Sequence, residues 1–191
     1  MFQPSSRESG ISADARVALL RGINVGRAKR IAMAELRTLF VSLGYGDVRT
    51  LLNSGNVVFT TADERPARSI VRIEQALHDQ LGLASRVTVL DATAIDTIIG
   101  ENPLLDVATN HSRLMATVLT DPKGMSKLAP VLDADWAPEI VARGSRAVYL
   151  WMPDGVADSK ASIALGKLVK DGATTRNWNT ILKLRELMRA M

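Results

Sequence analysis

The stretch "VRTLLNSGNVVFTT", residues 48–61, decides the fold. Two apolar, β-branched runs flank the tetrapeptide NSGN at 53–56, which is typical of a β-hairpin turn because Asn and Gly tolerate the left-handed backbone region. Apolar residues at helical spacing precede the hairpin in 32–46 and follow it in 70–82, and each of these segments ends at a glycine. The hairpin therefore lies between two predicted helices.

Two further strands extend this pattern outward. "RVALLRGI", residues 16–23, is a short apolar run before the first helix, and "RVTVLDA", residues 86–92, alternates after the second. The resulting order is β-α-β-β-α-β, the split βαβ or ferredoxin-like arrangement. The sequence therefore predicts an α+β fold.

A similar order of elements recurs in the second half. Its elements are, in order, a strand at 113–120, a helix at 125–132 interrupted by Pro130, two strands within 138–153 and a helix at 162–172. The last predicted element is the helix 176–191, which takes the place of a final strand. This modified βαββα unit suggests an internal duplication that is visible in element order rather than in residue identity.

The pattern divides the chain into four parts. We expect a disordered lead-in at 1–14, a ferredoxin-like subdomain at 15–92, a connecting helix and loop at 93–112, and a second α+β subdomain with the C-terminal helix at 113–191.

Composition narrows the class of protein. The 191 residues include no cysteine, which excludes disulfides and thiolate metal sites and favours a cytoplasmic location. The sequence shows neither a secretory signal nor an apolar run long enough to span a membrane. A net charge of +4 and a pI of 9.7 favour acidic partners such as phosphorylated metabolites or nucleic acid, with a solvated basic surface as the alternative.

Topology predicts where polar residues of the first half meet. In a split βαβ sheet, the end of the first strand and the hairpin between the second and third strands lie at one edge. This places "RGINVGR", residues 21–27, beside the hairpin turn, where its backbone amides could form an anion-binding concavity. The candidate ligand-binding side chains here are Arg21, Asn24, Asn53, Ser54 and Asn56. The alternative is that NSGN serves only as a turn.

The segment "TTRNWNT", residues 174–180, adds a further cluster. If Thr174 or Thr175 caps the last helix, then Arg176, Asn177 and Asn179 remain available to bind a ligand. Trp178 then either stacks on that ligand or packs in the core. Lys160 begins another helix after Ser159, where a phosphate could bind, although simple capping by the serine is the alternative.

The usual catalytic constellations are not evident. Neither His78 nor His111 stands at metal-ligand spacing or near a candidate nucleophile. Asp91, Asp121 and Asp154 each follow a predicted strand, where turns often use aspartate. We therefore predict no metal site, and the sequence assigns neither a cofactor nor a catalytic residue.

Several motifs together resemble a known bacterial family. "ALLRGINVG", "MAELR", "LNSGNVVF", "NPL", "YLWMPDGVADSK" and "ATTRNWNT" occur in this order, from about residue 16 to the C-terminus. The chain is in this respect similar to the uncharacterised family called domain of unknown function 1697. The resemblance implies an α+β fold with ferredoxin-like parts, and it implies no activity because none is established for the family.

These observations lead to one hypothesis with three alternatives. The chain is expected to bind an anionic ligand, phosphorylated or nucleotide-like, in a groove between the loops, with Arg21 and Arg176 pairing with the anion. The alternatives are a structural or interaction protein with no ligand, an enzyme acting on a phosphorylated small molecule, and a single-stranded nucleic-acid-binding module. The last requires exposed sheet aromatics, for which Phe59 and Tyr149 are the candidates. The sequence does not indicate the oligomeric state.

Overall fold

The computed structural model describes residues 12, 14–24, 30–62 and 64–191. The lead-in expected at 1–14 thus lies almost entirely outside the described residues. The elements of the first half are, in chain order, β1 (Ala15–Leu20), α1 (Met33–Ser42), β2 (Gly46–Leu51), β3 (Asn56–Thr60), α2 (Pro66–Leu81), β4 (Val87–Asp91) and α3 (Ala92–Gly100). The predicted β-α-β-β-α-β order is confirmed for this half.

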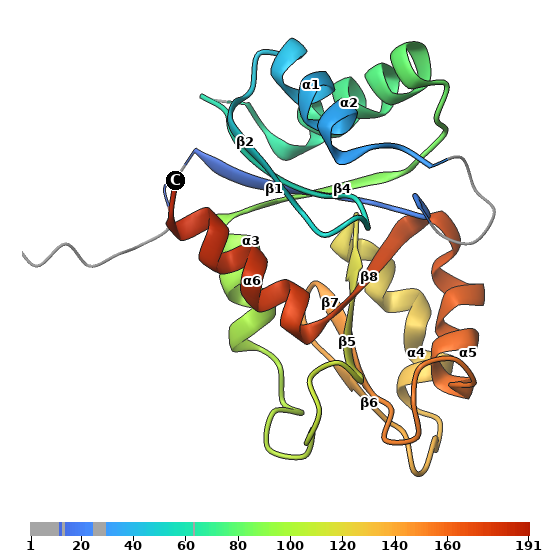
Figure 1. The fold of residues 1–191 in the computed structure, drawn as a ribbon. Coiled ribbons are helices and arrows are strands. Elements are labelled where there is room, and N and C mark those ends of the chain that lie inside the picture. Colours follow the sequence, from blue (N-terminus) through green and yellow to red (C-terminus); the bar gives the residue numbers. More distant parts are fainter. Residues whose placement is uncertain (1–11, 13, 25–29, 63) are drawn as a thin grey trace, which may run out of the picture.

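The first sheet has the strand order β2-β3-β1-β4, with antiparallel neighbours throughout. Helices α1 and α2 cover one face of it (Figure 1). The β2–β3 hairpin turns through Leu52 and Gly55, which have φ angles of 57° and 74°. Glycine is favoured at such a position because a side chain there is strained.

The second half repeats this plan. Its elements are β5 (Leu114–Leu119), the 3₁₀ helix η1 (Pro122–Leu128), α4 (Ala129–Leu132), β6 (Ile140–Arg143), β7 (Ala147–Trp151), α5 (Lys160–Val169), the 3₁₀ turn η2 (Lys170–Gly172), β8 (Ala173–Asn177) and α6 (Trp178–Arg189). The sheet order β6-β7-β5-β8 corresponds strand for strand to that of the first sheet. The expectation that Pro130 interrupts a helix is also refined, because Pro130 lies in the first turn of α4, where proline is tolerated.

The prediction that a helix replaces the final strand is wrong. Residues 173–177 form β8, which pairs antiparallel with β5, and the helix begins only at Trp178. The β-branched Thr174 and Thr175 favour a strand. Asn177 ends the strand and caps the helix, since its Oδ1 accepts a hydrogen bond from the Thr180 amide. Neither threonine is the helix cap.

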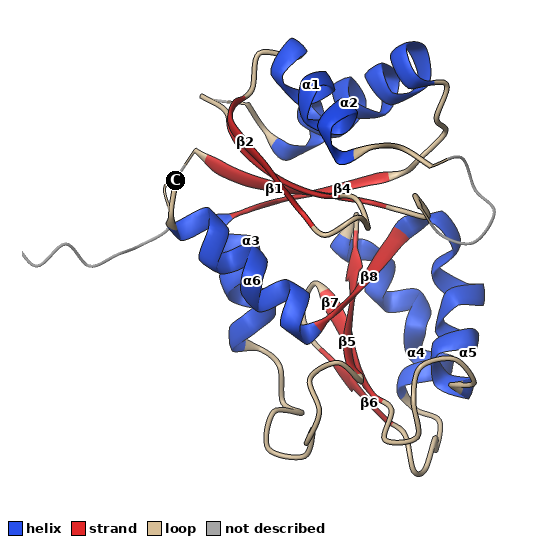
Figure 2. Ribbon diagram, viewed as in Figure 1, coloured by secondary structure: helices blue, strands red, loops and turns tan. Residues whose placement is uncertain are grey.

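A shared core lies between the two sheets. Helices α3 and α6 lie together in this core. They pack on the face of each sheet that the other helices of its unit do not cover (Figure 2). Trp178 is 1% exposed and packs edge-on against Tyr149, with ring centroids 6.2 Å apart. Arg185 of α6 donates to Asp96 of α3 at 2.6 Å. The far face of the second sheet is covered by η1, α4 and α5.

An ion pair between the buried Glu64 and the partly exposed Arg72 secures the helical layer of the first unit. Arg72 on α2 donates to both Glu64 oxygens at 3.1 Å, reaches the Leu43 carbonyl at 2.6 Å, and lies over the Tyr45 ring. Burial alone would raise the pKa of Glu64. The hydrogen bonds and the positive charge of Arg72 oppose that effect, and the pKa of Glu64 lies below its ordinary value.

Candidate functional site

Arg176 joins the two units where the end of β1 meets the hairpin turn at 53–56, a place that we call the rim. It lies on β8, but its guanidinium reaches the first unit, where Nε donates to Asn56 Oδ1 at 2.6 Å. Its Nη2 donates to the Leu20 carbonyl at 2.7 Å and to the Ser54 carbonyl at 3.1 Å. The end of β1 and the hairpin turn therefore meet in space, as the topology argument expects, and the final segment joins them, as the ligand-binding hypothesis requires.

The guanidinium has no N–H group to spare. Its Nη1 donates to Thr174 Oγ1 and to the Thr175 carbonyl, both at 2.8 Å, so each N–H of Arg176 has an acceptor within the protein. Burial lowers the pKa of Arg176 to about 10, and the side chain is still a cation at neutral pH. In this structure Arg176 is a structural cross-link, with every donor used by the protein itself.

The carboxamides of the rim are also engaged. Asn56 donates to the Leu51 carbonyl and to Ser54 Oγ, both at 3.0 Å. Asn24 donates to the carbonyls of Ile31 and Asn53 and accepts from the Ile31 amide. These bonds close the first loop and the hairpin turn, while the Asn53 side chain is exposed. Arg27 lies outside the described residues.

The predicted ligand-binding residues near the last helix are also mostly used within the protein. Asn177 is the cap described above, and Asn179 donates to Ser112 Oγ at 3.2 Å. The Trp178 ring is buried in the shared core, where it has no face open to a ligand. Of the four predicted ligand-binding residues at 176–179, Asn179 is the one that is exposed to solvent, while Arg176 and Asn177 are partly buried.

The start of α5 already carries an anion of its own. Ser159 caps the helix by accepting from the Ser162 amide. The carboxylate of Glu139 accepts from Ser159 Oγ at 2.5 Å and from the amides of Lys160 and Ala161 at 3.0 and 3.3 Å. The Glu139 carboxylate therefore occupies the position predicted for a phosphate, and the exposed Lys160 side chain is not part of that arrangement.

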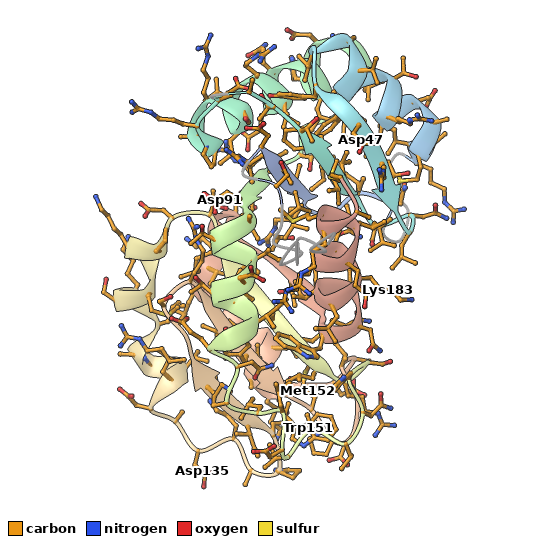
Figure 3. All side chains as sticks on the ribbon, turned by 90° about the vertical axis from the view of Figure 1, so that its left-hand side faces the viewer. Asp47, Asp91, Asp135, Trp151, Met152 and Lys183 are labelled. Atoms are coloured by element: carbon orange, nitrogen blue, oxygen red, sulfur yellow. The ribbon has the colours of Figure 1, made fainter. Side chains whose placement is uncertain are left out.

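Asp91 and Asp121, two of the three aspartates that follow predicted strands, act as helix caps. Asp91, labelled in Figure 3 at the start of α3, accepts from the Ala94 amide at 2.8 Å. Asp121 accepts from the Lys123 amide at 3.0 Å. The described part of the chain shows no group of three or more His, Asp or Glu side chains arranged to hold a metal ion.

Arg21 differs from Arg176 because it is only partly engaged. It donates to the Ala173 carbonyl at 2.6 Å and lies 3.7 Å from the Asp171 carboxylate, and its side chain is 36% exposed. With Ser85 and Arg86 it lines a cavity of about 510 Å³ beside the start of β4. Arg21 thus faces the solvent side of the junction between the units.

A larger cleft adjoins this cavity. It has a volume of about 740 Å³, and both spaces are lined by Glu74, Arg86 and Asp171. One wall is formed by α2 and the start of β4, and the other by η1 and the end of α5. The two walls belong to different units and are joined by a 2.7 Å hydrogen bond between the hydroxyls of Thr88 and Thr120.

We call this larger cleft the inter-unit cleft. Some of its charged side chains have partners within the protein, and others do not. Glu74 accepts from Arg86 and from the Val87 amide, while Asp121 and Asp171 are bound as described above. Lys123 and Lys127 line the same cleft, and their ammonium groups have no partner among the described residues. These two ammonium groups are therefore available to pair with an incoming anion.

No sequence motif indicates that Lys123 and Lys127 belong to a site. They lie in the η1 segment, which the sequence predicts only as a turn and a helix. Their position opposite α2 depends on how the two units pack, and that packing is not visible in local periodicity.

Comparison with known proteins supports the predicted family. Residues 14–149 match the family described as "Protein of unknown function (DUF1697)". The chain belongs to this family. A comparison with curated proteins found no significant match. A solved structure, that of the conserved bacterial protein SP0830 from Streptococcus pneumoniae, superposes with a TM-score of 0.76 at 21% identity, over 91% of this chain and 98% of that chain.

The comparisons establish the fold and the family only. The DUF1697 match ends within β7, so it includes the hairpin turn and η1 but not Arg176. No described helix combines the length and apolarity that crossing a membrane requires. The strand aromatics Phe59 and Tyr149 are both fully buried, and they offer no open stacking face of the kind that sheet-based RNA readers use.

Proposed function

We propose that this protein binds an anionic, phosphorylated or nucleotide-like small molecule in the inter-unit cleft. One observation carries the proposal: Lys123 and Lys127 line the inter-unit cleft, and their ammonium groups have no partner among the described residues. The volume of about 740 Å³ lies in the range of typical small-molecule sites. Arg21 at the adjoining cavity supplies a third cation with unused donors.

Apolar residues favour a ligand with more than a phosphate. Ile70 and Val71 of α2 face Leu168 and Val169 of α5 across the cleft. A nucleotide-like ligand could place its base or sugar against these side chains and its phosphates against the lysines. Binding would thus combine apolar burial with charge-assisted hydrogen bonds.

A thermal-shift screen tests this proposal. The probes are pyrophosphate, ribose 5-phosphate, AMP and ATP, with adenosine as the uncharged control, because a ligand that binds the native state raises its apparent stability. We expect the double variant Lys123→Gln/Lys127→Gln to bind the stabilising anion at least about tenfold more weakly, since a charge-assisted hydrogen bond contributes about 1.5–3 kcal/mol.

Lys183→Gln serves as the matched control. Lys183 is an exposed lysine on α6, does not line the cleft, and is labelled in Figure 3. The proposal fails if no anion in the panel stabilises the protein, or if the double variant binds as tightly as the Lys183→Gln variant.

A role without any ligand is the second candidate. Its specific support is that every donor of the Arg176 and Asn56 side chains is used within the protein, and that three of the Arg176 bonds cross to the first unit. If the screen finds no stabilising anion, this structural or interaction role becomes the better account of the rim.

A further inference from the structure

A second concave surface lies on the outer side of the second unit, between α4 and α5. It has a volume of about 400 Å³ and is lined by Val131 of α4, by Trp136, and by Ile163, Ala164 and Leu168 of α5. We call this surface the α4–α5 groove. It meets the inter-unit cleft only at Leu168, and the observations below do not depend on the function proposed for that cleft.

Core packing does not account for the exposed apolar side chains of the groove. The core face of α5 is formed by Ala161 and Leu165, which are buried. Ile163 and Leu168 lie outside that pair, about 140° apart around the helix axis, and their side chains are 53% and 41% exposed. A solvated helix would normally carry polar residues at such exposed positions.

The floor of the groove is preformed. The indole N–H of Trp136 donates to the Val131 carbonyl at 2.8 Å, which fixes the ring against the end of α4. Asp135, next to Trp136, accepts from the Ala137 amide. A rigid aromatic floor beside exposed aliphatic side chains is the kind of surface that anchors the apolar side chains of a partner.

The charged lining has a single sign. Lys160 and Lys167 are the charged residues among those that line the groove, and neither ammonium has a partner in the described part of the chain. They are seven residues apart on α5, a span of roughly 10 Å along the helix axis. An occupant therefore needs apolar anchors in its centre and carboxylates on its flanks.

We infer that the α4–α5 groove binds an acidic amphipathic helical segment of another protein. Such a helix presents anchors at i, i+3, i+4 and i+7, which match the helical spacing of the groove residues. A second copy of this chain is a poorer occupant because the chain carries a net charge of +4. Nucleic acid is also a poorer one, because two lysines give weak backbone attraction and the apolar floor would remain unused.

Fluorescence anisotropy with a designed probe tests the inference. The probe is a labelled peptide of about 14 residues with leucines at i, i+3, i+4 and i+7 and glutamates on its flanks. A second probe replaces the glutamates with lysines. We expect the full-length protein to bind the acidic probe at least about tenfold more tightly than the basic probe, because the flanking charges meet the two lysines.

Two variants locate the binding. Ile163→Glu is expected to weaken binding of the acidic probe at least about tenfold, because it places a charge among the anchors. Val41→Glu is the matched control, since Val41 is 55% exposed on α1, outside the groove. Lys160→Glu/Lys167→Glu is expected to reverse the preference, so that the basic probe binds more tightly. Circular dichroism shows whether each variant is folded.

The contrary results are specific. Equal binding of both probes, no binding of the acidic probe, or an Ile163→Glu variant that binds like Val41→Glu would each overturn the inference. A single-stranded oligonucleotide that binds directly and loses affinity in Ile163→Glu, while the acidic probe does not bind, would replace the peptide with nucleic acid.

Discussion

The substitution Arg176→Ala tests whether the rim holds the two units together. It removes the donor of two buried acceptors, Asn56 Oδ1 and the Leu20 carbonyl, and of the more exposed Ser54 carbonyl. Each buried polar group left without a partner costs about 1–3 kcal/mol, so the two together cost about 2–6 kcal/mol. At about 3 °C per kcal/mol for a chain of this size, Tm should fall by roughly 6–18 °C.

Urea and thermal unfolding followed by circular dichroism measure this effect. Arg176→Lys keeps the charge but cannot donate in the fork geometry, so most of the loss should persist. Arg37→Ala is the control, because Arg37 is an exposed arginine on α1 and its removal should change stability by less than about 0.5 kcal/mol. A Tm for Arg176→Ala within about 2 °C of the control's Tm would refute the cross-link argument, because each kcal/mol of stability changes Tm by about 3 °C.

Three further substitutions test individual features of the fold by urea unfolding. Glu64→Gln should destabilise the protein by a constant amount above about pH 5. That difference should shrink as the pH falls below about 4.5, because the folded-state pKa of Glu64 is lowered and the stabilisation is lost on protonation; a difference that does not change with pH would contradict this. Gly55→Ala should cost at least about 2 kcal/mol, since φ is +74° and the added Cβ would lie 2.7 Å from Ile23 Cδ1; a neutral result would show that the turn relaxes easily. Glu139→Ala should cost about 1–2 kcal/mol by leaving the first amides of α5 without their carboxylate; an unchanged midpoint would mean that solvent replaces it fully.

The first unit was predictable because its signals are local. The hairpin turn at 53–56 and the helical periodicity on either side fix the order of six elements. The second unit was predicted less well at its end, where β8 passes directly into α6 with no turn between them. Asn177 is both the last strand residue and the helix cap, and a sequence pattern read one element at a time does not separate these roles.

The meeting of distant loops was predictable, but the use of their side chains was not. Topology does not place Arg176 near the hairpin turn, because that depends on how the two units pack. The acceptors of the Arg176 guanidinium are mainly backbone carbonyls, such as that of Leu20. Backbone carbonyls carry no sequence signal. Lys123 and Lys127 cannot be identified from the sequence for a related reason, since their surroundings are supplied by the other unit.

The two arginines explain why the rim holds the fold while the neighbouring cleft is open to a ligand. Arg21, which follows β1, donates to the first residue of β8, and Arg176 near the end of β8 donates back to the last residue of β1. This reciprocal pair joins β1 of the first unit to β8 of the second. Arg176 has no donor left, whereas Arg21 meets only one carbonyl and the exposed Asp171 at 3.7 Å. A phosphate entering the cleft could replace that weak pair without disturbing the junction, so ligand binding and the cross-link can coexist on adjacent side chains.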